Sequence, residues 1–325
     1  MTMRAIAITR FGGPDVLQVV ERPVPEPSRG EVRVRIRATA VNRADLLQRQ
    51  GHYPAPSDAP ADIPGLELAG EVDAVGPGVE RLKRGDRVFG LVGGGGYAEA
   101  VTTHERALAL IPDGMSFEDA AAVPEAFITA HDAMIAQGDL RGGETLLVHA
   151  AGSGVGTAAI QLGHALGAYV VGTARTRAKL DRAKALGLDV GIVAESSVFA
   201  DAVRAASEPA VVLELVGGAY LDEDLRCTRP RGRIVLVGLM AGAKQELDLG
   251  LVLRKRLRIT GTVLRARPLE EKLAAMRTFE AQVVPLLARG LVKPVIDAVM
   301  PLADAAKAHA RMTSNEGFGK IVLCA

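Results

Sequence analysis

A cluster of glycines between residues 152 and 156 is the part of this sequence best suited to bind a charged ligand. Residues 145–148 before it are β-prone or apolar, which is typical of a parallel strand buried on both faces. The apolar pattern of residues 158–167 after it predicts a helix. A glycine-rich turn between a strand and a helix lets the backbone approach a pyrophosphate, and the first N–H groups of the helix bind its charge. The sequence therefore predicts a dinucleotide site here.

The spacing of this turn departs from the full G-x-G-x-x-G pattern. Ala151 and Ser153 stand at the first two glycine positions of that pattern, whereas Gly154 and Gly156 are kept. The loop alone therefore leaves open a tight turn that binds nothing, and the assignment depends on the residues that follow it.

The side chains that come roughly 20 residues after the glycine turn indicate which dinucleotide binds. An acidic residue there would bind a ribose 2′-hydroxyl group and so select NAD. Here the expected strand 168–174 is followed by Arg175, Arg177 and Lys179, and no carboxylate occurs before Asp181. Guanidinium and ammonium groups pair with phosphate through charge-assisted hydrogen bonds. We therefore expect NADPH rather than NADH; the alternative is a helix start whose charges are simply solvated.

Composition and charge argue against several other classes of function. The 325 residues suggest about two domains, and a hydrophobic content of 48% allows a large core. A net charge of +1 and an aromatic content of 3% argue against a nucleic-acid-binding surface, and no window predicts a transmembrane helix. Cys227 and Cys324 are too few for a disulfide framework or a four-thiolate zinc site. We expect a cytoplasmic protein that binds neither membrane nor nucleic acid.

The first 120 residues predict a β-rich domain. Residues 31–37 alternate strictly between charged and apolar side chains, which is typical of a half-exposed strand. A short helix is expected at residues 42–49, and Ser116 begins a capping pattern before a further helical segment. The other expected strands are residues 4–9, 16–20, 63–72, 87–91 and 97–101.

Helical patterns run to about Gln137, and from Glu144 on the patterns of strands and helices alternate. The expected strands lie near residues 145–149, 168–174, 189–193, 210–215, 233–238 and 257–264. Six strands in βαβ order are the full count of a doubly wound dinucleotide-binding domain. We assign residues 121–264 to that domain.

The alternation stops after residue 265. The expected elements there are a long helix at 269–289, a helix at 302–312 and strands at 295–300 and 319–323. These pieces are too few for a domain of their own. We therefore expect them to return to the N-terminal part of the chain, so that residues 1–120 and 265–325 form one discontinuous β domain.

Six segments, spread over nearly the whole chain, follow the pattern of a known family. They are Val41–Tyr53, Pro64–Val72, Ala122–Ala130, His149–Gly156, Arg231–Met240 and Gly319–Leu323. Together, and in this order, they resemble the medium-chain dehydrogenase/reductase superfamily, most of all its zinc-free branch of NADPH-dependent quinone oxidoreductases. The resemblance implies an α/β fold in which a discontinuous GroES-like β domain accompanies a Rossmann domain with a doubly wound parallel sheet.

The resemblance also bears on metal binding. Zinc-dependent members of the superfamily carry a cysteine and a histidine at positions where this chain has Asn42 or its neighbours and Leu66, and the cysteine-rich zinc lobe is missing. Without a thiolate and an imidazole, a zinc ion that acts as a Lewis acid would not be held. We therefore expect no metal site.

The resemblance assigns roles to individual residues. Asn42 and Tyr53 match positions that line the substrate pocket, and we expect both to be catalytic. The cofactor-binding matches are Tyr53, Thr129, Gly152, Ser153, Gly154, Val155, Gly156, Arg175, Lys179, Gly238, Leu239, Met240, Thr262, Leu264 and Lys320. Three alternatives are structural. Asn42 could simply cap a helix, and Tyr53 could be a ring packed on the surface. Leu239, Met240 and Leu264 could belong to the hydrophobic core. We expect Asp45 and Glu67 to be structural carboxylates.

These residues predict reduction of a quinone or a similar conjugated carbonyl compound by hydride from NADPH. The cofactor supplies the hydride, while the Tyr53 hydroxyl and the Asn42 amide stabilise the charge that develops on the acceptor oxygen. Two alternatives stay open: reduction of the double bond of an enone or enoyl thioester, and a low-turnover NADPH-binding protein with a structural or regulatory role. Relatives pair the sheet edge formed by residues 257–264 across a two-fold axis, so we expect a homodimer.

Overall fold

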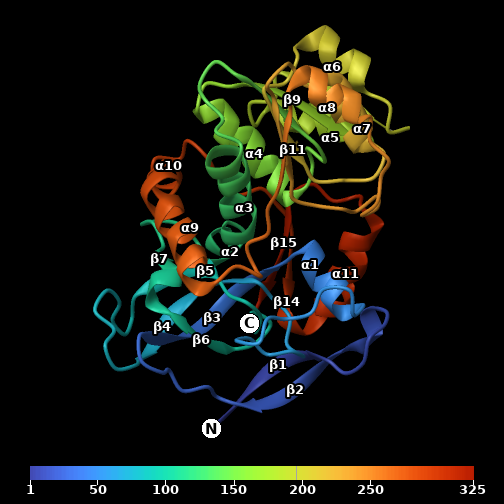
Figure 1. The fold of residues 1–325 in the computed structure, drawn as a ribbon. Coiled ribbons are helices and arrows are strands. Elements are labelled where there is room, and N and C mark those ends of the chain that lie inside the picture. Colours follow the sequence, from blue (N-terminus) through green and yellow to red (C-terminus); the bar gives the residue numbers. More distant parts are fainter. Residues whose placement is uncertain (195) are drawn as a thin grey trace. The chain divides into compact units, whose positions relative to one another are not determined.

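The computed structural model describes residues 1–194 and 196–325, which form two compact units (Figure 1). The first unit consists of Met1–Ile128 and Arg265–Ala325, and the second of Thr129–Leu264. In the colours of Figure 1, blue and red segments therefore belong to the same unit. Among the described residues, no helix has both the length and the apolar composition needed to cross a membrane.

The second unit is built on a parallel sheet. The sheet order is β10–β9–β8–β11–β12–β13, and every neighbouring pair is parallel. The winding reverses between β8 and β11, which is the predicted doubly wound arrangement. Each strand lies within its expected range but is shorter by one to four residues, which belong to the loops at its start or its end. The strands are β8 (Thr145–Val148), β9 (Tyr169–Ala174), β10 (Val190–Val193), β11 (Val211–Glu214), β12 (Arg233–Leu236) and β13 (Arg258–Gly261).

Helices connect these strands and cover the sheet. On one face, Leu147, Val171 and Val212 of the central strands pack against Phe199 beside α6 and Leu225 of α7 in one buried cluster. Burial on both faces explains why these strands read as continuous apolar runs in the sequence. The helices are α3 (Thr129–His131), η4 (Asp132–Gln137), α4 (Gly154–Ala165), α5 (Arg177–Lys184), α6 (Ala200–Ala206), α7 (Tyr220–Cys227) and α8 (Leu249–Lys255).

The first unit contains a mixed sheet that combines both parts of its chain. The order is β14–β15–β3–β4–β5–β7, with β6 paired to β3, and β1 and β2 form a separate antiparallel pair. Because β15 pairs antiparallel with β3, the C-terminal segment completes the N-terminal domain, as predicted. The strands are β1 (Thr2–Ile8), β2 (Leu17–Pro23), β3 (Glu31–Val41), β4 (Glu67–Val75), β5 (Arg87–Leu91), β6 (Ala100–His104), β7 (Leu108–Leu110), β14 (Ile296–Pro301) and β15 (Lys320–Cys324).

Two expected strands begin later than the sequence pattern suggests. The chain turns at Gly65, whose φ of 99° lies in the left-handed region, so β4 begins only at Glu67. Tyr97 is fully buried, and its backbone N–H donates to the carbonyl of Pro64, so this residue belongs to the connection and β6 begins at Ala100.

The helices of the first unit differ from expectation mainly near the C-terminus. The expected helix 269–289 is interrupted at Val283, because Pro285 has no N–H to continue the i→i−4 pattern and instead lies in the first turn of the next helix. The helices are η1 (Pro14–Val16), α1 (Arg43–Arg49), η2 (Glu105–Ala107), α2 (Phe117–Ala121), η3 (Pro124–Ile128), α9 (Leu269–Gln282), α10 (Val284–Ala288), η5 (Leu302–Asp304) and α11 (Ala305–Ser314).

Residues 121–128, which we expected in the Rossmann domain, lie in the first unit. The backbone N–H of Glu125 donates to Glu67 Oε2 at 2.8 Å, and this bond ties η3 to β4. A long-range hydrogen bond of this kind leaves no pattern in the local sequence.

Candidate active site

The glycine turn of the second unit leads from β8 into α4. Ser153 caps the helix, and its Oγ accepts a hydrogen bond from the Gly156 N–H at 3.0 Å. A Cβ atom on Gly156 would lie 2.4 Å from the carbonyl oxygen of Ala150, so only glycine permits this close return of the backbone. The first N–H groups of a helix have no acceptor within the helix, which leaves those of Gly154 and Val155 for an anion. This geometry fits a dinucleotide phosphate.

Arg175 follows β9 at the same edge of the sheet, because the carboxyl ends of parallel strands lie together. The side chain is exposed and makes no hydrogen bond or ion pair with another described residue. Lys179 lies in the first turn of α5 and is half-buried. The cationic position at the end of β9 thus has the location and the charge that a 2′-phosphate requires.

Other predicted cofactor residues follow the neighbouring strands. Gly238, Leu239 and Met240 lie in the loop after β12, and the two apolar side chains are 53% and 51% exposed, so their alternative assignment to the core is wrong. Thr262 follows β13, and its hydroxyl donates to Asp132 Oδ2 at 2.9 Å. The remaining two residues of this set, Thr129 at the start of α3 and Leu264, are half-buried.

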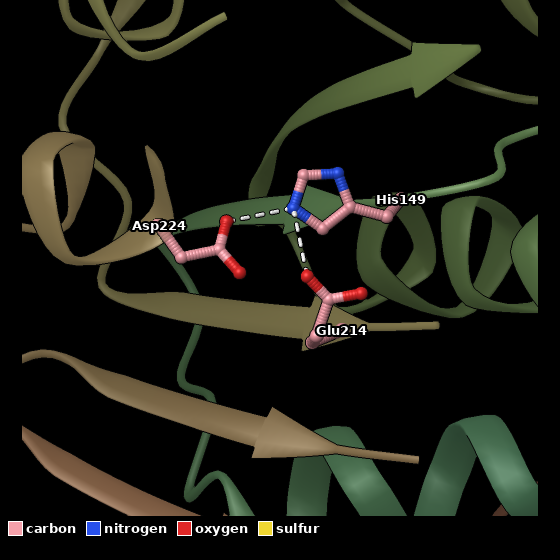
Figure 2. A group of neighbouring side chains, drawn as sticks. All are labelled: His149, Glu214 and Asp224. Atoms are coloured by element: carbon pink, nitrogen blue, oxygen red, sulfur yellow. Dashed lines mark hydrogen bonds and ion pairs between the residues drawn. The ribbon is translucent and has the colours of Figure 1, made fainter. Parts of the chain in front are cut away.

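A polar cluster lies at the carboxyl ends of β8 and β11 (Figure 2). His149 follows β8, Glu214 ends β11, Asp224 belongs to α7, and all three side chains are completely buried. His149 Nε2 lies 2.7 Å from Asp224 Oδ1 and 3.8 Å from Glu214 Oε2. On the other side of the ring, His149 Nδ1 lies 2.7 Å from Thr173 Oγ1 of β9. The sequence analysis did not single out this cluster, because its members come from four separate segments.

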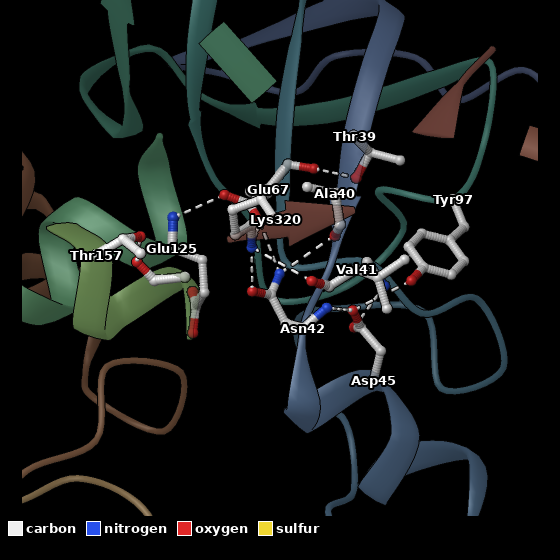
Figure 3. Close-up of polar contacts among 12 residues, drawn as sticks. Thr39, Ala40, Val41, Asn42, Asp45, Glu67, Tyr97, Glu125, Thr157 and Lys320 are labelled. Atoms are coloured by element: carbon white, nitrogen blue, oxygen red, sulfur yellow. Dashed lines mark hydrogen bonds and ion pairs between the residues drawn. The ribbon is translucent and has the colours of Figure 1, made fainter. Parts of the chain in front are cut away.

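In the first unit, a buried network joins Lys320, Glu67 and Asn42 (Figure 3). Lys320 Nζ donates to Glu67 Oε1 at 2.6 Å and to Asn42 Oδ1 at 2.5 Å. The Asn42 amide nitrogen in turn donates to Glu67 Oε1 at 2.7 Å and to the Ala40 carbonyl at 3.2 Å. The carboxamide of Asn42 is therefore fully engaged within the protein.

Asp45 holds the start of α1 next to this network. Its carboxylate accepts the backbone N–H of Asn42 at 2.8 Å and that of Gly65 at 3.1 Å, and the Tyr97 hydroxyl lies at 3.3 Å. Burial raises the pKa of Asp45 to about 6. Asp45 and Glu67 thus satisfy buried hydrogen bonds, which agrees with their expected structural role.

Tyr53 of the first unit presents a polar group that is still available. Its hydroxyl has no hydrogen-bond partner among the described residues, and the Arg265 guanidinium lies 5.3 Å from the centre of its ring. Arg265 is itself fixed by hydrogen bonds to Gln48 Oε1 and the Gly93 carbonyl, both 2.7 Å long. Burial, together with the charge of Glu125, raises the pKa of Tyr53, so the hydroxyl keeps its proton and can donate it.

Glu125 and Arg265 are site residues that the sequence analysis missed. Burial, followed by the negative charge of Glu67, raises the pKa of Glu125 to about 8, so its carboxyl group is neutral at pH 7. A single carboxylate within the apolar run of residues 120–130 is the signal that indicates Glu125. Arg265 has no comparable signal, since arginine is common in loops.

The positions that hold zinc in zinc-dependent relatives do not fit a zinc ion here. Leu66 offers no ligand atom, and the Asn42 carbonyl oxygen already accepts a hydrogen bond from the Lys320 ammonium group. Among the described residues no thiolate lies beside this pair, and the ammonium group of Lys320 already carries a positive charge next to the Asn42 oxygen.

Comparisons with known proteins agree with this geometry. The model of the alcohol dehydrogenase GroES-like domain matches residues 28–113, and that of the zinc-binding dehydrogenase matches residues 154–281. A quinone oxidoreductase of Pseudomonas aeruginosa is 36% identical and covers 98% of this chain and 99% of its own.

Two solved structures resemble the chain over 99% of its length and over the full length of their own chains. A mycobacterial protein in complex with NADPH superposes with a TM-score of 0.90 at 30% identity. A protein described as an NAD-dependent alcohol dehydrogenase superposes with a TM-score of 0.87 at 34% identity.

Proposed function

Since the chain belongs to the medium-chain dehydrogenase/reductase superfamily of oxidoreductases, we propose that it reduces quinones by hydride transfer from NADPH without a metal ion. The observation that carries the choice of cofactor is the exposed Arg175 at the end of β9, which pairs with no other described residue and stands where an acidic residue would favour NAD. The NADPH complex of a relative supports the same choice.

The residues of the second unit fit NADPH in two places. The backbone N–H groups of Gly154 and Val155 would bind the pyrophosphate at the start of α4, and Arg175 and Lys179 would bind the 2′-phosphate. When bound, the cofactor supplies the hydride.

In the first unit we assign the donor role to Tyr53. Its protonated hydroxyl, which has no partner within the described part of the chain, would donate a hydrogen bond to the acceptor oxygen while negative charge develops there. Asn42 was expected to share this role, but both hydrogens of its amide are already donated to Ala40 and Glu67. We therefore assign Asn42 a positioning role, together with Lys320, at the end of β3.

We further propose, as the sequence predicts, that one domain carries the catalytic residues and the other binds NADPH. Residues 1–120 and 265–325 would form the catalytic GroES-like domain, with residues 121–128 packed against it, and the rest of 121–264 would bind NADPH. The free thiols Cys227 and Cys324 accord with the expected cytoplasmic location.

We also propose a homodimer formed through the sheet edge at β13. β13 is the last strand of its sheet, and the preceding helix α8 exposes Leu249 and Leu253 to 71% and 78%. An open strand edge next to apolar side chains is a surface that a second copy would cover. Light scattering coupled to gel filtration should give twice the mass of the chain, and a monomer at micromolar concentration would contradict the proposal.

The central test is oxidation of NADPH against a panel of quinones and enones, with NADH as the control cofactor. We expect quinone-dependent turnover that is faster with NADPH, and no loss of activity after treatment with a chelator. The Tyr53→Phe variant should lower turnover, whereas Tyr169→Phe, which alters a half-exposed tyrosine of β9, should not. Turnover with enones alone would favour the double-bond reductase, and binding of NADPH without turnover would favour the low-turnover protein. Stoichiometric zinc that activity requires would contradict the metal-free mechanism.

A further inference from the structure

The buried cluster around His149 connects the loops after β8 and β9, which carry predicted cofactor residues, with the loop after β11. His149 directly precedes the glycine turn, and Thr173 lies two residues before Arg175. Glu214 Oε1 accepts hydrogen bonds from the backbone N–H groups of Val216 and, at 2.8 Å, Gly217, so it fixes the loop after β11. The aromatic rings of Phe199 and Tyr220 lie 4.9 Å from the imidazole and enclose the cluster.

The hydrogen bonds of the cluster leave two acceptors without a donor. We assign the proton of neutral His149 to Nε2, which then donates to Asp224 Oδ1, while Nδ1 accepts the hydrogen of the Thr173 hydroxyl. Glu214 Oε2 and Asp224 Oδ2 are buried and accept no hydrogen bond from any described residue. An unsatisfied buried carboxylate oxygen is costly, and two ionised carboxylates side by side repel each other.

A proton shared between the carboxylates explains the short distances in this cluster better than a bound metal ion does. One potential ligand atom from each of His149, Glu214 and Asp224 lies within 4.8 Å of the others. Two ligands of a tetrahedral zinc ion at about 2.1 Å from the metal stand roughly 3.4 Å apart. The 2.7 Å between His149 Nε2 and Asp224 Oδ1 is instead the length of a hydrogen bond. A proton on Glu214 supplies the donor that Asp224 Oδ2 lacks.

We propose that one proton held among Glu214, Asp224 and His149 positions the loops after β8, β9 and β11, and that NADPH binds most tightly when this proton is present. The inference rests on the proposed function of the loops after β8 and β9 in NADPH binding. His149, Glu214 and Asp224 act as positioning residues, because each reaches the cofactor only through the backbone that it holds.

The charged surroundings of the cluster give the direction of its pH dependence. Burial raises the pKa values of Glu214 and Asp224 to about 7 and lowers the pKa of His149. The other titratable groups nearby belong to Glu223, Tyr220, Cys227 and Arg175. Since both carboxyl pKa values lie above those of the unfolded chain, the protonated state is favoured at low pH and its contribution is lost as pH rises through about 7.

The Glu214→Gln variant tests the role of this proton, because it replaces a donor that titrates with one that does not. Its amide oxygen can still accept the backbone bonds of Val216 and Gly217, while its NH₂ group donates permanently to Asp224. We would measure the dissociation constant of NADPH at pH 6, 7, 8 and 9 for the wild type, for this variant and for Glu208→Gln, a half-exposed carboxylate on the surface, as control. The ratio of wild-type to variant constants cancels the titration of the ligand itself.

We expect this ratio to rise by at least about threefold between pH 6 and pH 9, and by at most about tenfold for each pH unit above 7. The Glu208→Gln ratio should stay constant. A Glu214→Gln ratio that is equally flat would overturn the inference while leaving NADPH binding intact.

The melting temperature of the ligand-free protein provides a second measurement that does not depend on NADPH. Between pH 6 and pH 8.5 the wild type should lose stability relative to Glu214→Gln; parallel profiles would overturn the inference. If neither protein binds NADPH but the profiles diverge, the proposed function fails and the shared proton stands. If Glu214→Gln does not fold, Thr173→Val serves instead, and its pH profile should also depart from that of the wild type. A stoichiometric metal ion bound by the cluster would overturn the proton assignment.

Discussion

Replacing Lys320 by methionine should destabilise the first unit far more than its single lost charge suggests. The side chains of Lys320 and Glu67 are only 5% and 0% exposed, and their closest atoms are 2.6 Å apart. Methionine matches the length of the lysine chain but offers Glu67 no positive charge. The carboxylate would then be buried as an uncompensated anion, which is the costly outcome for a buried ion pair.

The magnitude follows from what remains around Glu67. Loss of one partner of a buried pair costs about 3–5 kcal/mol. Glu67 keeps the hydrogen bonds from the Asn42 amide at 2.7 Å and from the Glu125 N–H at 2.8 Å, so we expect about 3–4 kcal/mol, in the lower part of that range. In a unit of about 190 residues, each kcal/mol lowers the unfolding midpoint by about 2–4 °C. The expected shift is therefore roughly 6–16 °C.

Differential scanning calorimetry of the full chain measures this shift. Lys307→Met is the matched control, because Lys307 forms an exposed pair with Asp304 at 2.8 Å, and such pairs contribute about 0–1 kcal/mol. Adding Glu67→Gln to Lys320→Met should recover at least about 1 kcal/mol, since the buried anion is then removed. A Lys320→Met shift no larger than that of Lys307→Met would refute the idea that a buried charge is being compensated.

Three further outcomes test other parts of the structure. Arg175→Ala should raise the dissociation constant of NADPH by about tenfold to a hundredfold in titrations, because one charge-assisted hydrogen bond is lost. The dissociation constant of NADH should stay nearly unchanged. Equal effects on both constants would contradict the 2′-phosphate assignment. Gly156→Ala should abolish NADPH binding, since its Cβ would meet the Ala150 carbonyl at 2.4 Å, whereas Gly261→Ala meets nothing within 4 Å and should bind normally. Because the pKa of Glu125 is raised to about 8, wild-type stability should fall as pH rises through about 8. Glu125→Gln should flatten this part of the plot of melting temperature against pH. An unchanged slope of that plot would contradict a neutral carboxyl group.

Much of the fold could be predicted because burial on one side of an element leaves a periodic pattern in the sequence. The alternation in residues 31–37 matches β3, where Val32, Val34 and Ile36 are buried. Positions that depend on distant contacts were less predictable. Tyr97 was expected in a strand, but its ring is held in the core by Asp45 and His309 from other elements, so it belongs to a connection.

The residues of the candidate site also differ in how far they could be predicted from local sequence. The glycine turn and Arg175 were predicted, because a strand, a turn and a charge at fixed spacing are local features of the sequence. The network of Glu67 and Lys320 joins residues 253 positions apart, and only the pairing of β15 with β3 brings these side chains together. For the same reason, the meeting of His149 with Asp224 depends on the order of strands and helices, which no short motif specifies.

The pairing of β15 with β3 also affects the order in which the chain folds during synthesis. Glu67 leaves the ribosome 253 residues before the lysine that neutralises it, a delay of roughly 13–50 s at 5–20 residues per second. The second unit is continuous in sequence and is complete before β15 has been made. The N-terminal strands therefore keep an open edge at β3 until β15 has been made, and the second unit can fold in that interval. Chaperones that cover exposed strands would act on this chain in that interval, before its last strand arrives.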